Sequence, residues 1–236
     1  MSRPVRPSRF WETLAVVIVK PLSWLLVKKD WRHGERLPRA GGVIIVANHL
    51  SWVDPLLVSH FLYNNGRWPV ILAKAGLFRV PFLGAAVRGL LAIPVERGSD
   101  EAIRSLKAAE GRLADGAAVF FYPEGTCTRD PALWPMVGKT GAARLALESG
   151  APVIPVAHWG AQDVLPYGEK KPRLFPRKTF RVSVGRPVDL SGYAGRSPHA
   201  DVLREATADI MAAITAQLAE LRGGKAPETP YDPAGR

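Results

Sequence analysis

From residue 41 onward, short apolar runs alternate with helical segments, and this alternation limits the possible folds more than any other pattern in the sequence. The runs are rich in Val and Ile and are bounded by Gly, Pro or charged residues, as buried strands are. Strands that alternate with helices predict a single α/β domain with a largely parallel central sheet and helices on both faces. The expected strands are residues 41–48, 68–74, 90–97, 116–125, 151–160 and 179–190, and the expected helices are 55–63, 99–116, 138–150 and 199–221.

The segment before this alternation has a different pattern. Its apolar stretches, Leu14–Val19 and Leu22–Val27, are separated by Lys20 and Pro21, and each is far shorter than the roughly 20 residues of a spanning helix. Flanking Trp and basic residues are typical of a helix or helical hairpin lying in a membrane interface. The alternative is an amphipathic helix packed on the domain. The predicted division is a membrane-associating segment at 1–38, the α/β domain at 39–222 and a disordered tail at 223–236.

The net charge of the chain limits the classes of partner that it is expected to bind. Lys and Arg number 32 against 21 acidic residues, giving a formal charge of +11, which favours nucleic acid, anionic lipid headgroups or phosphorylated substrates. Nucleic acid is disfavoured because no nucleic-acid-binding module is present and the basic residues lie among apolar ones. Residues 168–181 place six basic residues around Leu174 and Phe175. This segment is either a solvated loop or a contact with anionic lipid.

Polar residues concentrate directly after the expected strands, in residues 48–54, 96–100, 122–130 and 158–163. In a parallel α/β sheet, ligands bind beyond the carboxyl ends of the strands. We therefore expect the functional site in these segments.

His49 and Asp54 follow the first of these strands. Asp54 precedes Pro55, and this pair is a good helix start, with Asp as the N-cap; Ser51 is a rival cap. Residues five apart on a regular helix do not face each other. If the chain turns back after the strand, however, Asp54 can accept the Nδ1 hydrogen of His49 and leave Nε2 as a general base. Capping and orienting remain compatible, because a carboxylate has several acceptor positions.

Other chemistries find little support. The chain has no GxSxG, GxGxxG or GxxxxGK[ST] motif. The single cysteine, Cys127, excludes an internal disulfide, fits a reducing compartment and is a weak candidate for a nucleophile. The 5 His do not pair at a ligand spacing, so no metal site is predicted.

Several motifs together resemble a known family. Residues 48–54, NHLSWVD, match the NHxSxxD form of an HxxxxD motif, and residues 122–126, YPEGT, match a [FY]PEGT block. A strand ending in Arg97 lies between them, and residues 138–146 and 151–157 resemble the blocks that follow. Over residues 40 to 160 the chain thus resembles the glycerolipid acyltransferases, most of all the 1-acylglycerol-3-phosphate (lysophosphatidic acid) acyltransferases.

The resemblance implies acyl transfer from acyl-CoA or acyl carrier protein to a free glycerol hydroxyl of lysophosphatidic acid, with no metal, no cofactor and no covalent enzyme intermediate. His49 would be the general base, oriented by Asp54. Arg97 and the Glu124-Gly125-Thr126 loop would bind the glycerol phosphate, with Lys74 or backbone amides as oxyanion donors. The remaining implied substrate-binding residues are Asn48, Ser51, Arg129 and Lys139. A solvated surface charge is the alternative for Arg97, and for Lys139 it is an equally good interpretation.

One departure from the family pattern concerns the acceptor. The family commonly has arginine directly after PEGT, whereas here Cys127 and Thr128 intervene before Arg129. The acceptor therefore stays open: glycerol-3-phosphate or another lysophospholipid is an alternative, as is a non-catalytic lipid-binding protein. The implied location is peripheral or monotopic, on the cytoplasmic face of the cell membrane. Acyl chain length and oligomeric state are not implied.

Overall fold

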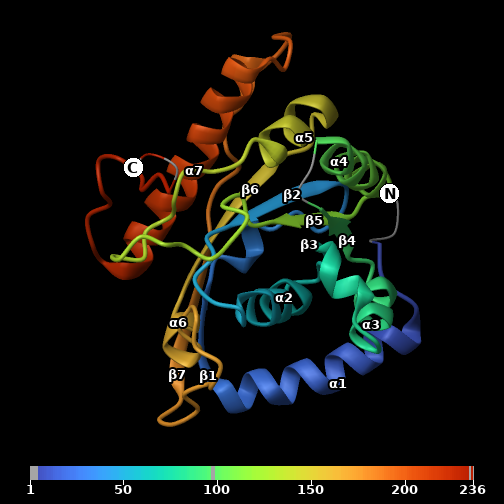
Figure 1. Ribbon diagram of the computed structural model, residues 1–236, viewed down its shortest axis with the longest axis vertical. Coiled ribbons are helices and arrows are strands. Elements are labelled where there is room, and N and C mark those ends of the chain that lie inside the picture. Colours follow the sequence, from blue (N-terminus) through green and yellow to red (C-terminus); the bar gives the residue numbers. More distant parts are fainter. Residues whose placement is uncertain (1–4, 97–98, 234, 236) are drawn as a thin grey trace.

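A single seven-stranded sheet organises the part of the chain that the computed structural model describes, residues 5–96, 99–233 and 235 (Figure 1). Its order is β1-β7-β6-β2-β5-β3-β4. The strands are β1 (Val27–Arg32), β2 (Val43–Ala47), β3 (Pro69–Lys74), β4 (Ile93–Val95), β5 (Ala118–Phe121), β6 (Val153–Trp159) and β7 (Lys178–Val184). The helices are α1 (Arg9–Leu26), α2 (Asp54–Asn64), α3 (Leu83–Gly89), α4 (Ser99–Ala114), α5 (Gly141–Ser149), α6 (Ala161–Val164) and α7 (Ala200–Arg222), with 3-10 turns η1 (Gly34–Arg36), η2 (Ala75–Arg79) and η3 (Ser191–Tyr193).

The sheet is mostly parallel, as predicted. Strand β2 lies at its centre and pairs in parallel with β5 and β6, and β3 pairs in parallel with β5 and β4. Strands β1 and β7 are also parallel to each other, and the antiparallel pair is β6 with β7. The carboxyl ends of β6, β2 and β5 therefore meet at one edge of the sheet.

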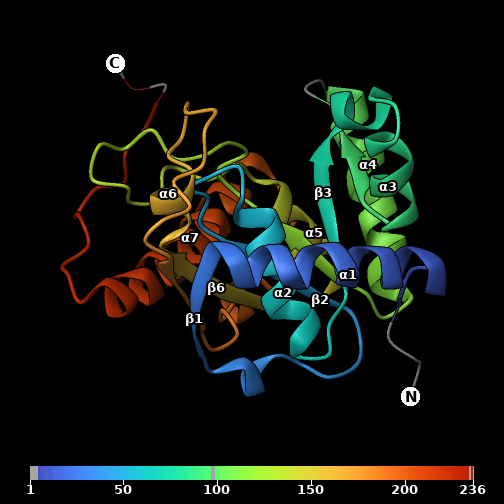
Figure 2. The same cartoon turned by 90° about the horizontal axis from the view of Figure 1, so that it is seen from below.

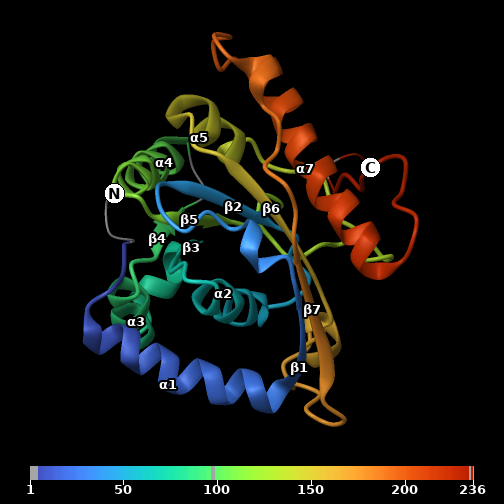
Figure 3. The same cartoon turned by 180° about the vertical axis from the view of Figure 1, so that it is seen from behind.

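Helices cover both faces, which confirms the predicted layers (Figure 3). The side chains of β2 alternate between two apolar clusters because successive residues of a strand point to opposite faces. Val43 and Ile45 pack with Leu57 and Phe61 of α2, whereas Ile44 packs with residues of α4, α5 and α7. All five residues of β2 are buried, so β2 forms the middle layer of the core.

The N-terminal segment differs from its prediction. It forms one helix, α1, with Pro21 inside it, and is not a helical hairpin. Residues Val27–Arg32 then form β1, which adds an edge to the sheet beside β7 and which the sequence analysis did not anticipate. The sequence VKKDWR hides this strand because charged residues outnumber its apolar residues, Val27 and Trp31.

All six expected strands are shorter than predicted, most of all those that contain β4, β5 and β7. Strand β4 begins at Ile93, since residues 90 and 91 form a turn, and β7 ends at Val184, before Gly185 and Pro187. The segment between β3 and β4, for which no element was expected, forms η2 and α3. Tyr231, in the tail predicted to be disordered, bridges Met136.

Helix α1 lies across the face of the molecule that carries α2 and α3 (Figure 2). Its first half contacts α3, where a Cβ on Gly89 would lie 2.2 Å from a ring carbon of Trp11. Its outward side exposes large apolar residues, including Phe10 (67%), Val17 (63%) and Trp24 (65%). Within the described residues, no helix combines the length and the apolar content that crossing a membrane requires.

Candidate active site

Three segments predicted to carry function come together at the carboxyl ends of neighbouring strands. Residues 48–54 follow β2, residues 122–130 follow β5 and residues 158–163 run from the last residues of β6 into α6. Because β6, β2 and β5 are adjacent and parallel, these segments converge. The fourth such segment, residues 96–100, includes residues 97 and 98, which lie outside the described residues.

His49 and Asp54 form a direct pair. The Nδ1 atom of His49 lies 2.9 Å from Oδ2 of Asp54, whose side chain is fully buried. The same oxygen accepts the backbone N–H groups of Leu50 (2.5 Å) and Ser51 (2.8 Å). An ionised carboxylate only accepts, so Nδ1 carries the hydrogen and Nε2 has its lone pair available.

The turn before α2 explains how residues five apart meet. Asp54 is the first residue of α2, but its carboxylate points back to residues 49–51 and makes no capping hydrogen bond to the helix. The interpretation of Asp54 as an N-cap is therefore wrong. Pro55 fits the first turn, where a missing N–H costs nothing.

The loop that follows β5 fixes the backbone of His49. Its N–H donates to Oε1 of Glu124 (2.9 Å), and its carbonyl accepts the N–H of Thr128 (2.7 Å). The second oxygen of Glu124 accepts the N–H of Met136 (3.0 Å). Burial raises the pKa of Glu124 to about 8, and the charge of Asp54 adds to the effect. Glu124 thus links the loop after β5 to His49, with both oxygens occupied by backbone groups.

The imidazole ring of His49 is held from the side by the same loop. Tyr122 stacks on it with ring centroids 4.1 Å apart and an angle of 21° between planes. Cys127 Sγ lies 3.6 Å from Nε2 and 3.7 Å from Nδ1. Burial, followed by the charges of Asp54 and Glu124, raises the pKa of the Cys127 thiol to about 12. A neutral, buried thiol is a poor nucleophile.

The side chains gathered around His49 form a group that we call the His49 cluster, with members Asp54, Tyr122, Glu124, Cys127 and His158. His158 was not among the predicted site residues. Its Nε2 lies 2.6 Å from the carbonyl oxygen of Asn48 and 3.6 Å from Oδ2 of Asp54. It is fully buried, and burial is the main reason that its pKa is lowered. The neutral ring therefore donates from Nε2 toward the turn that carries His49. Its position at the end of the strand beside β2 was the available signal.

The other predicted site residues divide into two groups. Asn48 exchanges two hydrogen bonds of 3.0 Å with the backbone of His158, and Ser51 donates to the carbonyl of Leu165 (2.6 Å). Both side chains are buried, so the structure gives them positioning roles. Contact of Asn48, Ser51 and Glu124 with substrate stays a prediction.

The second group lies nearer to solvent. Gly125 has a φ of +70°, and a Cβ there would approach the Lys139 side chain to 2.9 Å, so Lys139 lies over the PEGT loop. Thr126 is half-buried, and Lys74 and Arg129 are exposed. Arg97 lies outside the described residues, and its predicted phosphate contact remains a prediction.

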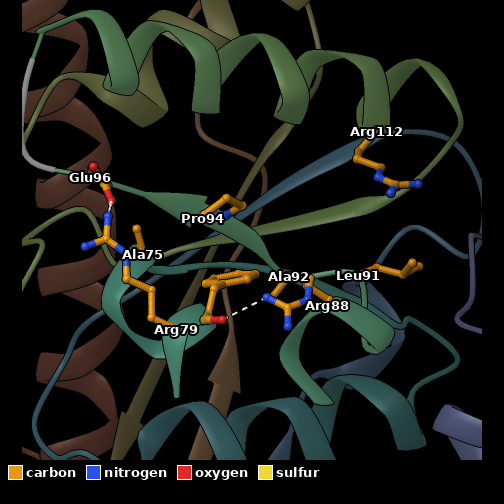
Figure 4. Close-up of a pocket in the computed structure, with 9 residues that line it drawn as sticks. Ala75, Arg79, Arg88, Leu91, Ala92, Pro94, Glu96 and Arg112 are labelled. Carbon is orange, nitrogen blue, oxygen red and sulfur yellow. Dashed lines mark hydrogen bonds and ion pairs between the residues drawn. The ribbon is translucent and has the colours of Figure 1, made fainter. Parts of the chain in front are cut away.

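A cavity of about 520 Å³ lies beside β4, toward the edge of the sheet (Figure 4). Its wall is mostly apolar, and Arg79, Arg88 and Arg112 also line it. Arg79 pairs with Glu96 at 2.6 Å, and Arg88 donates to the carbonyl of Phe78. Strands β5 and β3 separate β4 from β2, so this cavity is distinct from the His49 cluster.

No group of three or more His, Cys, Asp or Glu side chains among the described residues is arranged to hold a metal ion.

The site and the sheet define an α/β protein with a histidine–aspartate pair at the carboxyl end of its central strand. Residues 31–159 match the acyltransferase family, and this chain belongs to that family, which confirms the resemblance inferred from its motifs.

Individual relatives agree. A 1-acyl-sn-glycerol-3-phosphate acyltransferase of Borreliella burgdorferi is 36% identical over 143 residues, covering 58% of this chain and 54% of the relative. A chloroplastic protein of the same name from Brassica napus is 29% identical over 163 residues, covering 68% of this chain and 45% of the relative. The chain thus spans about half the length of these relatives. The crystal structure of a 1-acyl-sn-glycerophosphate acyltransferase from Thermotoga maritima shares the fold, with a TM-score of 0.63, 21% identity and coverage of 93% of this chain and 86% of that one.

Proposed function

We propose that this protein transfers an acyl group from acyl-CoA or acyl carrier protein to the free hydroxyl of a lysophosphatidic acid, giving phosphatidic acid. The observation that carries the proposal is the hydrogen bond from Nδ1 of His49 to the buried carboxylate of Asp54. Relatives that bear the name 1-acyl-sn-glycerol-3-phosphate acyltransferase support the choice of acceptor.

His49 acts as the general base in this proposal. Its Nε2 takes the proton from the acceptor hydroxyl while the hydroxyl oxygen attacks the thioester carbonyl carbon. The tetrahedral intermediate collapses with cleavage of the C–S bond, and the proton passes from the imidazolium to the departing thiolate. Asp54 stabilises the imidazolium and fixes the tautomer of His49. The products are an ester and a free thiol.

The reaction proceeds without a covalent enzyme intermediate, a metal or a cofactor. The nearest candidate nucleophile, Cys127, is buried, and its pKa is raised to about 12. A thiol in that environment gives almost no thiolate near neutral pH. Direct attack by the acceptor hydroxyl needs only a general base, and His49 is that base in this proposal.

The acceptor phosphate is proposed to bind on the β5–β3–β4 side of His49. The strand that precedes Arg97 in sequence, β4, lies on that side of the sheet. Arginine binds phosphate well because its guanidinium donates two parallel hydrogen bonds. The Glu124-Gly125-Thr126 loop, Arg129 and Lys139 complete this proposed subsite. The proposed oxyanion donors are Lys74, the last residue of β3, or backbone amides.

The proposed place of action is a membrane surface, with the protein bound peripherally on the cytoplasmic face. Helix α1 supports this, because its outward side exposes apolar residues that include Phe10, Val17 and Ile18. Changing these three residues to serine should reduce flotation with liposomes and leave thermal unfolding unchanged. Unaltered flotation would contradict a membrane role for α1.

The catalytic proposal is tested by thiol release from acyl-CoA in the presence of lysophosphatidic acid. His49→Ala should abolish turnover, since it removes the base, while lipid binding remains. The matched control is His199→Ala, which alters an exposed histidine at the N-cap of α7 whose side chain makes no capping hydrogen bond. Full activity of the His49 variant would exclude the mechanism, and wild type without turnover on any acceptor would favour a lipid-binding protein. A panel of glycerol-3-phosphate and other lysophospholipids identifies the acceptor.

A further inference from the structure

Three cations gather where α1 ends, and each lies over an aromatic ring. Lys20 Nζ lies 5.1 Å from the ring centroid of Tyr63, and Lys29 Nζ lies 4.7 Å from that of Trp31. The guanidinium of Arg177 lies 5.0 Å from the ring centroid of Trp24. They come from α1, from β1 and from the loop before β7, and we call them the α1 cation cluster.

The members of this cluster have no acidic partner. Throughout the part of the chain that the structure describes, none of Lys20, Lys29 and Arg177 makes an ion pair with a carboxylate. The nearest acid in sequence, Asp30, is engaged by Arg32 and lies 3.8 Å from Arg181. Successive side chains of a strand alternate, so Asp30 projects to the face of β1 opposite to Lys29.

A buried histidine faces the cluster and also lacks an acid. His60 is 3% exposed; its Nε2 lies 3.5 Å from Lys29 Nζ, and its Nδ1 is buried without a hydrogen-bond partner. Burial, with help from Lys29 and Lys20, lowers the pKa of His60 to about 4. The pKa of Lys29 is lowered as well, by burial first and then by Lys20 and Arg177. The positive charges thus repel one another without compensation.

The carbonyl groups at the end of α1 do not restore the balance. A helix C-terminus carries about half a negative charge, which is small beside three full positive charges. Cation–π contacts stabilise a cation without neutralising it, so its charge stays available to an anion. The cluster therefore lacks one component, a negatively charged group.

The surroundings indicate what kind of anion fits. Leu22, Trp24 and Leu25 of α1 are exposed directly beside the cluster, and Phe175, two residues before Arg177, is 75% exposed. Figure 2 shows α1 crossing the molecule with no other element in front of it. An anion that is bound here lies next to an apolar surface. A phospholipid combines these two properties, since its phosphate is attached to acyl chains.

We propose that Lys20, Lys29 and Arg177 bind the phosphate of an anionic membrane phospholipid while the adjacent apolar residues of α1 enter the interface. The site deepens the proposed membrane role, on which it rests, and gives α1 a preference for anionic lipid. It is separate from the acceptor site, because His60 lies two turns into α2 whereas His49 precedes that helix.

The experiment compares binding of the full-length protein to phosphatidylcholine vesicles with and without phosphatidylglycerol. The test variant combines Lys20→Gln, Lys29→Gln and Arg177→Gln. The matched control removes three charges elsewhere, by Lys107→Gln, Arg144→Gln and Lys225→Gln. At about fivefold per charge, the test variant should bind anionic vesicles about a hundredfold more weakly than wild type. The control should lose less than tenfold, and binding to phosphatidylcholine alone should be equal for all three proteins.

Two controls test the interpretation of this experiment: variants that preserve the three charges, and binding of a soluble anion. Lys20→Arg, Lys29→Arg and Arg177→Lys together should keep the anionic preference, which separates a charge effect from misfolding. Equal losses in the test and control variants would overturn the site in favour of diffuse charge. Saturable binding of inorganic phosphate to wild type, lost in the test variant, would overturn the lipid assignment in favour of a soluble anion.

Acyl transfer in detergent micelles distinguishes this proposal from the catalytic one. The test variant should keep wild-type turnover there, because none of its three residues contacts the His49 cluster. If lipid preference is absent while turnover persists, the lipid site fails and the catalytic proposal stands. If turnover is absent in wild type while the lipid preference is present, the catalytic proposal fails and the lipid site stands.

Discussion

Helix α2 has a histidine near each of its ends, and the two have opposite surroundings. His49, just before the helix, contacts the carboxylate of Asp54 at 2.9 Å and is held through its N–H by Glu124. His60, near the other end, faces Lys29 at 3.5 Å, with Lys20 also acting on it. The same side chain is thus placed in an anionic environment at one end and a cationic one at the other.

The difference shows that the charges around a histidine determine whether its imidazole is easily protonated. A carboxylate that accepts a hydrogen bond from Nδ1 is the partner that the proposed role of His49 as a general base requires. Cations and burial oppose protonation of His60, whose pKa is lowered to about 4, so His60 stays neutral near pH 7. The carboxyl edge of the central strands therefore suits proton transfer, whereas the end of α1 suits anion binding.

The largest expected effect comes from removing the charge beside His49. In Asp54→Asn, the amide no longer stabilises the imidazolium, and its NH2 group can face the N–H donors of Leu50 and Ser51. Turnover should fall by about 10³-fold or more, as for other histidine–carboxylate pairs. Thiol release measures this, with circular dichroism as the folding control. A loss of less than tenfold would show that His49 does not need the pair.

A smaller loss of turnover is expected when His158, which supports the turn that carries His49, is changed. His158→Ala deletes the 2.6 Å hydrogen bond to the carbonyl of Asn48 and leaves that acceptor buried. An unsatisfied buried acceptor costs about 1–3 kcal/mol, so kcat should fall by about ten- to a hundredfold with little change in KM. His158→Gln keeps a donor and should recover part of the activity. A pure stability role would lower Tm and leave kcat and its pH profile unchanged.

The pH dependence of stability tests the surroundings of Glu124, the carboxyl group that binds the backbone of His49. Its pKa is raised to about 8 in the folded protein, above its ordinary value of 4.5, so between these pH values the folded state binds the proton that the unfolded state releases. Stability should therefore fall as pH rises from about 4.5 to 8. Glu124→Gln should flatten this slope in urea unfolding series. An unchanged slope would assign the pH dependence to other groups.

His60 should give the opposite slope, over a narrower range. Its folded-state pKa of about 4 lies below the ordinary 6.5, so the unfolded state binds more protons in between. Stability contributed by neutral His60 should be present above pH 6.5 and be lost as pH falls toward 4. His60→Gln should reduce this loss in thermal unfolding measured from pH 4.5 to 7. A steeper loss in the variant would contradict the cationic environment.

Much of the architecture was predictable because strands and helices leave strong local patterns. The runs containing β2, β3, β5 and β6 are apolar and bounded by turn residues, so they were found. Strand β1 was missed because VKKDWR has no apolar run, and only pairing with β7 makes it a strand. The motif residues His49 and Asp54 were identified from sequence, whereas His158 was not, since nothing local distinguishes it from a core histidine.

The sequence carries the alternation of strands and helices from residue 41 onward, and it therefore predicts which loops follow parallel strands and meet at one edge. It also determined the spacing from His49 to Asp54 and to the PEGT loop. The packing of the folded chain sets the direction of each carboxylate: Asp54 turns away from the helix that it begins, and Glu124 accepts hydrogen bonds from the backbone of His49 and Met136. It also decided that Lys20, Lys29 and Arg177 meet, because contacts between residues far apart in the chain depend on how the elements pack.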